Sequence, residues 1–394
     1  IMNADVAIIG AGATGLFTAL DLSLRGINVT VIDRGGLISG TSGRMHGLLH
    51  SGARYVTNDM TSAKQCIEEN IILNRIAPHA IFDTKGLFVA VKGDEDSFIE
   101  EFVKGLNEAG IPYSEVKNAL ELEPNLNKNV EYAVQVPDKV VDPFKLFAGV
   151  AYAAKQNGAK FLLYSPVKEI SGSKIITERG EIESKLVINA AGPWAPRISA
   201  MHSNESKVVE LMPTIGVMLV YNQKLNNMVL NRLRPPSDGD ILVPYYDTSI
   251  LGTTAQVVED PDNAEIADED IQYLIEEGSA MVPKLLELKP KRYYYSVRPL
   301  LKGTDARSAT RDFEIYDEGD MLTIIGGKLT TSRLMAEKLS DVASEKLGKE
   351  SKSRTATTSI PDALSIYALR NTIGDEIYGN GYALSRLEEA LQYD

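Results

Sequence analysis

A glycine-rich turn between two predicted strands constrains the fold of this chain more than any other feature. Asp5 to Ile9 reads as a buried strand, and Gly10-x-Gly12-x-x-Gly15 follows it and opens an apolar helix. In such a turn the first glycine permits the tight bend and the second lets the backbone approach a pyrophosphate. The third lets the helix pack on the sheet. The pattern therefore predicts a βαβ unit with a phosphate site at the helix N-terminus.

The residues after this helix support the same interpretation. The helix ends at Arg25-Gly26, and a second predicted strand, 28–32, ends on Asp33. A carboxylate in that place can accept hydrogen bonds from ribose hydroxyls. An ordinary β-turn explains this ordered context poorly, so we expect a dinucleotide ligand. The motif does not say which dinucleotide binds.

Size, composition and charge are those of an ordinary globular protein. The chain has 394 residues, 44% hydrophobic and 24% charged, enough for two intertwined domains with a large core. The net charge of −13 argues against nucleic acid as a partner. It also argues against adhesion to anionic lipid through a general positive field. No apolar run approaches the length of a membrane-spanning helix.

The cysteine content limits the chemistry further. Cys66 is the only cysteine, which rules out an intramolecular disulfide and an iron–sulfur cluster held by several thiolates of this chain. We expect no metal site. We also expect no secretory signal, since the dinucleotide fold starts at the first residues. The expected location is the cytoplasm, with a peripheral position at the cytoplasmic face of the membrane as the alternative.

The order of predicted elements indicates an α/β fold with two insertions. Elements alternate at the start and near the end of the chain, whereas short β-rich segments separated by turns fill the middle. We predict a Rossmann-like dinucleotide domain and a second, largely antiparallel β-sheet domain that binds substrate. The first is assembled from residues 1–79, 145–205 and 295–360, the second from 80–144 and 206–294, and residues 361–394 form a short helical tail.

Three clusters of residues could carry chemistry. Residues 39–55 hold two of the four histidines, two arginines and many small residues that let a backbone approach a flat ring. Residues 295–300 form the second cluster, together with 310–312. Residues 326–333 join a predicted strand to a helix N-terminus, which could receive an anionic group. A single arginine or lysine is usually a solvated charge, but here arginines recur beside glycine turns at predicted strand ends, where open α/β sheets bind ligands.

These motifs resemble those of the FAD-dependent D-amino-acid-oxidase superfamily of flavoproteins. Within it they are most similar to the FAD-dependent glycerol-3-phosphate dehydrogenases, in particular the catalytic A subunits of the anaerobic enzymes. The resemblance runs from Asp5 to about Leu347. Besides the glycine turn, it rests on motifs in the family's order at residues 41–55, 141–144, 189–194, 236–244, 296–300 and 326–331.

The resemblance implies a non-covalently bound FAD and the oxidation of sn-glycerol 3-phosphate to dihydroxyacetone phosphate, with hydride transfer from C2 to flavin N5. The FAD contacts that it implies are Gly10, Gly12, Ala13, Thr14, Gly15, Asp33, Arg34, Thr41, Ser42, Gly43, Arg44, His46, Gly47, Leu49, His50, Val167, Ala190, Ala191, Gly192, Trp194, Arg298, Gly326, Gly327, Lys328, Leu329 and Thr330. The substrate contacts that it implies are Arg54, Tyr55, Arg298, Arg311 and Lys328, with catalytic roles for His50, Arg298 and Lys328.

The residue types suit this chemistry. An imidazole titrates near neutral pH, so His50 is the candidate base for the hydroxyl proton, although a structural histidine beside the flavin explains it equally well. Arginines match a phosphate dianion through bidentate hydrogen bonds. Lys328 could stabilise a developing alkoxide or negative charge at the N1–C2 carbonyl end of the flavin.

The route by which electrons leave is open at this stage. The anaerobic catalytic subunits of this type usually continue into a cysteine-rich C-terminal module, whereas Cys66 stands alone here. A separate partner subunit, a quinone and oxygen are all acceptable electron acceptors, and a peripheral membrane contact would suit a quinone.

Other functions remain as alternatives. An L-2-hydroxyglutarate dehydrogenase, or another dehydrogenase or oxidase of 2-hydroxy acids, also carries a turn like His50-Ser51-Gly52, but residues 298–300 and 326–331 argue against it. An amino-acid oxidase would need an amine-recognising site that the sequence does not show. A non-catalytic flavin protein would hold an FAD that no substrate reduces. In a nicotinamide-dependent dehydrogenase, the segments that the resemblance assigns to the flavin would have no flavin to contact.

Overall fold

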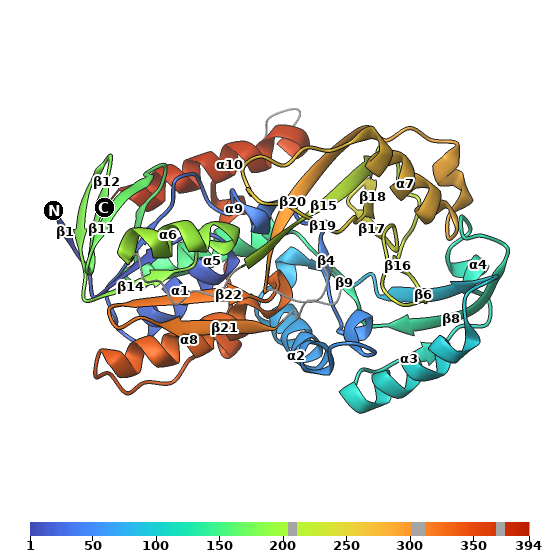
Figure 1. The fold of residues 1–394 in the computed structure, drawn as a ribbon, viewed down its shortest axis with the longest axis horizontal. Helices are drawn as coiled ribbons and strands as arrows, with labels where there is room; N and C mark the ends of the chain where they lie inside the picture. The colour runs from blue at the N-terminus through green and yellow to red at the C-terminus, as the bar shows by residue number, and fades with distance from the viewer. Residues whose placement is uncertain (204–210, 302–311, 368–374, 394) are drawn as a thin grey trace.

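A mostly parallel sheet, here called the central sheet, organises one half of the molecule (Figure 1). The computed structural model describes residues 1–203, 211–301, 312–367 and 375–393. Within these ranges the central sheet has the strand order β10-β3-β2-β14-β22-β21. Its strands are β2 (Val6–Ile9), β3 (Val29–Ile32), β10 (Lys160–Leu162), β14 (Leu186–Asn189), β21 (Phe313–Asp317) and β22 (Met321–Gly326). Neighbours run parallel, except that β21 and β22 form an antiparallel hairpin.

The βαβ unit predicted from the glycine turn lies in the middle of this sheet. Helix α1 (Ala13–Leu24) connects β2 to β3, and both strands are buried along their whole length, as expected for parallel strands covered on both faces. Helix α1 packs against α5 (Pro143–Gln156) and α8 (Ser332–Lys346). The rings of Phe17 and Phe147 meet edge to face with their centres 5.5 Å apart, which fixes α1 on α5.

A larger, mostly antiparallel sheet, here called the second sheet, forms the other half of the molecule, on the right in Figure 1. Its strand order is β19-β15-β18-β17-β16-β6-β8-β7. β18 and β19 pair with different parts of β15, and β20 pairs with β15 along its length, on the opposite edge. The strands are β6 (Gly86–Val91), β7 (Ser114–Glu115), β8 (Val130–Val136), β15 (Leu211–Tyr221), β16 (Val229–Arg232), β17 (Ile241–Tyr245), β18 (Thr248–Gly252), β19 (Gln256–Val257) and β20 (Arg292–Leu301). Helices α3 (Asp96–Ala109), α4 (Ala119–Leu122) and α7 (Asp268–Ser279) contribute to the apolar clusters around this sheet.

The remaining elements join or flank the two sheets. They include α2 (Met60–Ile76), α6 (Ala195–His202), α9 (Ala363–Tyr367) and α10 (Asp375–Gln392). One small sheet contains β4 (Leu48–Leu49), β9 (Lys139–Val141) and β5 (Ile81–Phe82), and another contains β1 (Met2–Asn3), β13 (Gly180–Glu183), β12 (Lys174–Thr177) and β11 (Val167–Ser171). Among the described residues, no helix is both long and apolar enough to cross a membrane.

This architecture confirms the predicted fold class, a Rossmann-like domain joined to a largely antiparallel sheet domain. The domain boundaries stay a prediction. Residues 295–301, which we assigned to the dinucleotide domain, pair with β15 in the second sheet because β20 continues through Pro299 to Leu301. The predicted C-terminal tail contains α10, which packs against α5 and β10 in the half of the molecule that contains the central sheet.

Candidate active site

A cavity of about 960 Å³ lies between the two sheets. One wall comes from the carboxyl ends of β2, β3, β14 and β22, where Ile9, Asp33, Ala190 and Gly326 reach it. The opposite wall comes from the second sheet, from residues of β15, β20 and the segment after β18. Ligands of open α/β sheets bind at the carboxyl ends of the strands, and the volume suits a large organic ligand.

The glycine turn forms the floor of this cavity, and two of its glycines are enforced by close packing. Gly10 has φ of +120°, and a Cβ atom there would lie 2.3 Å from the carbonyl oxygen of Ala190. A Cβ atom on Gly15 would lie 1.9 Å from the carbonyl oxygen of Gly10. Gly12 faces the cavity itself. The backbone thus approaches the cavity as closely as a pyrophosphate site requires.

Asp33 lies at the end of β3 and lines the same floor. Its Oδ2 accepts a hydrogen bond from the Ala11 amide at 2.8 Å, and its Oδ1 accepts one from the Gly35 amide at 2.7 Å. Burial raises the pKa of Asp33, and these two amides offset part of that shift. Each carboxylate oxygen has a further lone pair, so the side chain can also accept hydrogen bonds from ribose hydroxyls.

His50 and Lys328 lie at another part of the cavity, where segments far apart in the sequence meet. The His50 amide donates to the Thr330 hydroxyl at 3.2 Å. The Tyr55 ring centre lies 5.2 Å from that of His50 and 4.7 Å from Lys328 Nζ. Within the described residues Lys328 Nζ is buried and has no hydrogen-bond partner. A buried ammonium group in this state calls for an acceptor on a bound ligand.

Arg298 projects from β20 in the second sheet and lines the cavity. Its Nη2 donates to the Thr253 hydroxyl and, at 3.4 Å, to the Thr254 carbonyl oxygen. Gly216 on β15 leaves room for the guanidinium, since a Cβ atom there would lie 2.5 Å from Arg298 Nη2. Two cations, Arg298 and Lys328, therefore reach one cavity from different parts of the fold.

Arg54 is placed differently from the expectation. Its Nη1 lies 3.7 Å from Oδ2 of the buried Asp240, which also pairs with Arg234 at 2.8 Å. Burial raises the pKa of Asp240, and the two arginines oppose that shift. In the described part of the chain Arg54 is not among the residues that line the cavity.

Most of the residues predicted for the FAD site do line the cavity. They are Gly10, Gly12, Ala13, Thr14, Asp33, Arg34, Thr41, Ser42, Arg44, His46, His50, Val167, Ala190, Ala191, Gly192, Trp194, Arg298, Gly326, Gly327, Lys328, Leu329 and Thr330. The predicted residues that lie behind its walls, in the ranges described, are Gly15, Gly43, Gly47, Leu49, Arg54 and Tyr55. Packing explains several of these: Leu49 is fully buried, and a Cβ atom on Gly43 would lie 2.1 Å from the carbonyl oxygen of Ile38. Arg311 lies outside the described residues.

Several lining residues were not anticipated from the sequence. Met218 and Thr253 come from the second sheet and the segment after β18, and Arg197 and Asp262 come from α6 and the loop before α7. No local motif marks them, because only the pairing of distant strands brings them to the cavity. Arg197 alone carries a weak signal, since it follows Trp194 by one helical turn.

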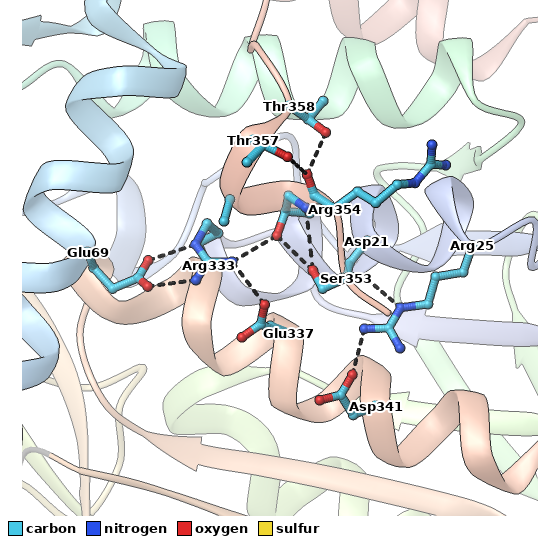
Figure 2. Close-up of polar contacts among 12 residues, drawn as sticks. Asp21, Arg25, Glu69, Arg333, Glu337, Asp341, Ser353, Arg354, Thr357 and Thr358 are labelled. Atoms are coloured by element: carbon cyan, nitrogen blue, oxygen red, sulfur yellow. Dashed lines mark hydrogen bonds and ion pairs between the residues drawn. The ribbon is translucent and has the colours of Figure 1, made fainter. Parts of the chain in front are cut away.

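A buried ion pair lies at the start of α8, directly after the cavity segment that contains Lys328 and Thr330. Figure 2 shows this pair, which Arg333 forms with Glu69. Arg333, in the first turn of α8, donates to both carboxylate oxygens of Glu69 on α2, at 2.7 and 2.9 Å. The next residue, Asn70, donates to the carbonyl oxygens of Leu49 and His50, at 3.4 and 3.3 Å. Helix α2 thus forms hydrogen bonds with both the His50 segment and the start of α8.

Comparison with known proteins places this site in context. The model of the family described as FAD dependent oxidoreductase matches residues 5–341. The chain is 40% identical over 404 residues to the A1 subunit of the anaerobic glycerol-3-phosphate dehydrogenase of Haloferax volcanii, with 94% of this chain and 68% of the relative covered. It is 37% identical over 383 residues to the A subunit of the anaerobic glycerol-3-phosphate dehydrogenase of Escherichia coli K12, with 91% and 70% covered.

Solved structures share the fold. Glycine oxidase from Geobacillus kaustophilus superposes with a TM-score of 0.75 at 19% identity, covering 92% of this chain and 99% of that one. The glycerol-3-phosphate dehydrogenase of Bacillus halodurans, solved with FAD, superposes with a TM-score of 0.69 at 24% identity, covering 91% and 68%.

Proposed function

The chain belongs to the FAD dependent oxidoreductase family, and from this premise we propose that it oxidises sn-glycerol 3-phosphate to dihydroxyacetone phosphate. The observation that carries the proposal is the convergence of Arg298, Lys328 and His50 on one cavity. Two cations and a proton acceptor suit a phosphorylated secondary alcohol. The names of the two relatives above support the same substrate.

The cavity fits FAD as its cofactor. The close-packed glycine turn, the Asp33 carboxylate and a volume of about 960 Å³ suit a dinucleotide. When bound, FAD supplies the acceptor for the hydride from C2 of the alcohol. The Thr41–Arg44 segment and the Gly327–Thr330 segment both line the cavity, and we assign them to opposite sides of the flavin ring.

Each polar group at the reacting end then has a role. His50 accepts the proton of the substrate hydroxyl as the C–H bond at C2 breaks. Arg298 holds the phosphate, and its bond to Thr253 fixes the direction of the guanidinium. Lys328 Nζ donates to the oxygen that loses its proton and stabilises the charge that develops there. The Tyr55 ring lies against both His50 and Lys328, which supports a positioning role for Tyr55. The contact of Arg54 with Asp240 supports a structural role for Arg54, and substrate contact by Arg311 remains part of the proposal.

Electrons leave the reduced cofactor to a second component in this proposal. Both relatives named above are single components of larger enzymes, as their names say, which supports an electron-accepting partner subunit. A quinone that takes electrons through a peripheral membrane contact is the alternative acceptor.

An anaerobic visible spectrum, recorded before and after the addition of sn-glycerol 3-phosphate, tests the proposal. The flavin band of the purified protein should bleach promptly with sn-glycerol 3-phosphate and persist with L-2-hydroxyglutarate. Bleaching by the hydroxy acid alone would replace the substrate assignment with the 2-hydroxy-acid alternative. A flavin band that neither compound bleaches would favour a non-catalytic flavin protein. A protein that binds no FAD even after reconstitution would contradict the cofactor assignment.

A further inference from the structure

An acidic loop in the half of the molecule that contains the second sheet contacts residues near the floor of the cavity. This loop, residues 258–263, begins the connection from β19 to α7, and its Asp262 receives hydrogen bonds from three residues of the half that contains the central sheet. Oδ1 accepts from Trp194 Nε1 at 2.9 Å and from Arg34 Nη2 at 3.1 Å, and Oδ2 accepts from Arg197 Nη1 at 2.5 Å. The Asp262 carboxylate thus contacts Arg34, which follows β3, Trp194, which follows β14, and Arg197, which lies in α6.

The contacts lie over the part of the cavity next to the glycine turn. Arg34 directly follows Asp33, the proposed ribose ligand. The Trp194 ring lies against Gly40, where a Cβ atom would come within 3.2 Å of it, and the nearby Ser42 hydroxyl accepts from the Ala13 amide at 3.0 Å. The same Trp194 ring is covered by the Arg34 guanidinium, 4.7 Å from the ring centre. Asp262 itself lines the cavity.

The charges of this contact are balanced. Arg197 also donates to Asp260 at 2.6 Å, so two guanidinium groups face two carboxylates. Partial burial raises the pKa of Asp262, but the hydrogen bonds from Arg197, Trp194 and Arg34 outweigh it and lower the pKa to about 2. Asp262 is therefore ionised at neutral pH. A pair of carboxylates beside a pyrophosphate would repel it, so their pairing with arginines is what makes this loop compatible with the cavity.

We propose that loop 258–263 closes the ribose–phosphate end of the FAD cavity, with Asp262 as the positioning residue that holds Arg34, Trp194 and Arg197 in place and slows the release of FAD. The proposal rests on FAD as the bound cofactor but not on the identity of the substrate. It gives Asp262, which lies in the half of the molecule that contains the second sheet, a role in cofactor retention.

Asp262→Asn tests the proposal, because it removes the charge and keeps the shape. Glu265→Gln is the matched control, since it makes the same change of charge at an exposed site in the same connection. Trp194→Phe removes the indole N–H donor together with the part of the ring that lies against Gly40. FAD release is followed after dilution of each holoprotein by the rise of flavin fluorescence. Trp194 is the only tryptophan of the chain, so in the variants that keep it, its emission reports release from the same place.

Asp262→Asn, which weakens three hydrogen bonds at once, should release FAD about fivefold faster than the unchanged protein at low ionic strength, and Trp194→Phe should be intermediate. Added salt should accelerate release from the unchanged protein more than from Asp262→Asn, because salt screens the contacts that the variant lacks. Glu265→Gln should release FAD like the unchanged protein. Release from Asp262→Asn and Trp194→Phe within about twofold of the control would overturn the proposal, since neither contact would then retain the cofactor.

Two further outcomes separate this proposal from the others. If Asp262→Asn purifies without FAD yet unfolds at the same temperature as the unchanged apoprotein, the retention role is supported. If sn-glycerol 3-phosphate fails to bleach the flavin while Asp262→Asn still releases FAD faster, the substrate assignment fails and the role of the loop stands.

Discussion

The burial and the contacts of Lys328 are set by the cavity around it, and the neighbouring residues in the sequence do not predict them. Its sequence context, Gly-Gly-Lys-Leu-Thr-Thr, predicts a glycine turn before a helix. The structure adds that Nζ is buried, lies over the Tyr55 ring and has no hydrogen-bond partner among the described residues. An ammonium group so placed stabilises negative charge far better than one in water.

Replacing Lys328 by Met should therefore lower kcat/KM for sn-glycerol 3-phosphate by about 100-fold, as loss of one charge-stabilising donor does in other enzymes. Anaerobic stopped-flow reduction of the flavin measures the effect, and the absorbance ratio of flavin to protein checks that FAD is retained. Lys328→Arg keeps the charge and should recover part of the rate. An unchanged rate of reduction in Lys328→Met would remove this residue from the chemistry.

Asp33 gives a prediction for pH. Burial raises its pKa, so in the folded protein it takes up a proton at a higher pH than an ordinary aspartate does. Above that raised pKa the ionised carboxylate accepts hydrogen bonds from the ribose, and as the pH falls through it this acceptor is lost. FAD affinity should therefore weaken on acidification before ordinary aspartates titrate. Titration of the apoprotein with FAD at decreasing pH measures this, and in Asp33→Asn the same range should show a flatter dependence.

At the scale of elements, sequence patterns identified those whose cause is local. The strand–turn–helix–strand unit of residues 5–33 carries its signals in consecutive residues, and the structure has it. The sequence did not show that β20 extends to Leu301, because its length is set by pairing with β15. The same reason explains the site: Thr253 and Asp262 reach the cavity through the path of distant strands, and no spacing in the chain encodes that.

The contact between α2 and α8 contains a buried ion pair. Glu69 and Arg333 are both 2% exposed and share two hydrogen bonds (Figure 2). Glu69→Gln removes the bidentate counter-charge of the buried guanidinium and leaves only Glu337, at 3.5 Å, so the free energy of unfolding should fall by about 3 kcal/mol. Urea unfolding of the holoprotein measures the change.

Glu181→Gln is the control for this prediction. It breaks the exposed pair with Lys174 and should leave the urea midpoint unchanged. A fall for Glu69→Gln no larger than that of the control would show that the buried pair adds nothing to the stability of the packed helices.

At the scale of the whole molecule, the cavity is the place where the two sheets share a ligand. Its walls come from the carboxyl ends of the central sheet and from β15 and β20, so neither half encloses it alone. A ligand that touches both halves should stabilise both together. The sequence predicted the two halves but gave no sign of how much of the cavity each one lines.

Excess FAD should therefore raise the temperature at which both halves unfold and keep them in one transition. At a free concentration one hundred times its Kd, the gain in unfolding free energy should be about 2.7 kcal/mol. Differential scanning calorimetry of the apoprotein with increasing FAD measures this. If one transition shifts with FAD while a second stays fixed, only one half of the molecule binds the cofactor.

The strand order of the central sheet also bears on how the protein is made. β14 lies between β2, which is translated before it, and β22, which follows more than a hundred residues after β14. The segment that carries Lys328 and Thr330 is translated later still. Until it emerges, the nascent chain has the glycine turn but lacks the cavity-lining residues of this segment, so translation must pass Thr330 before the cavity is complete for the cofactor.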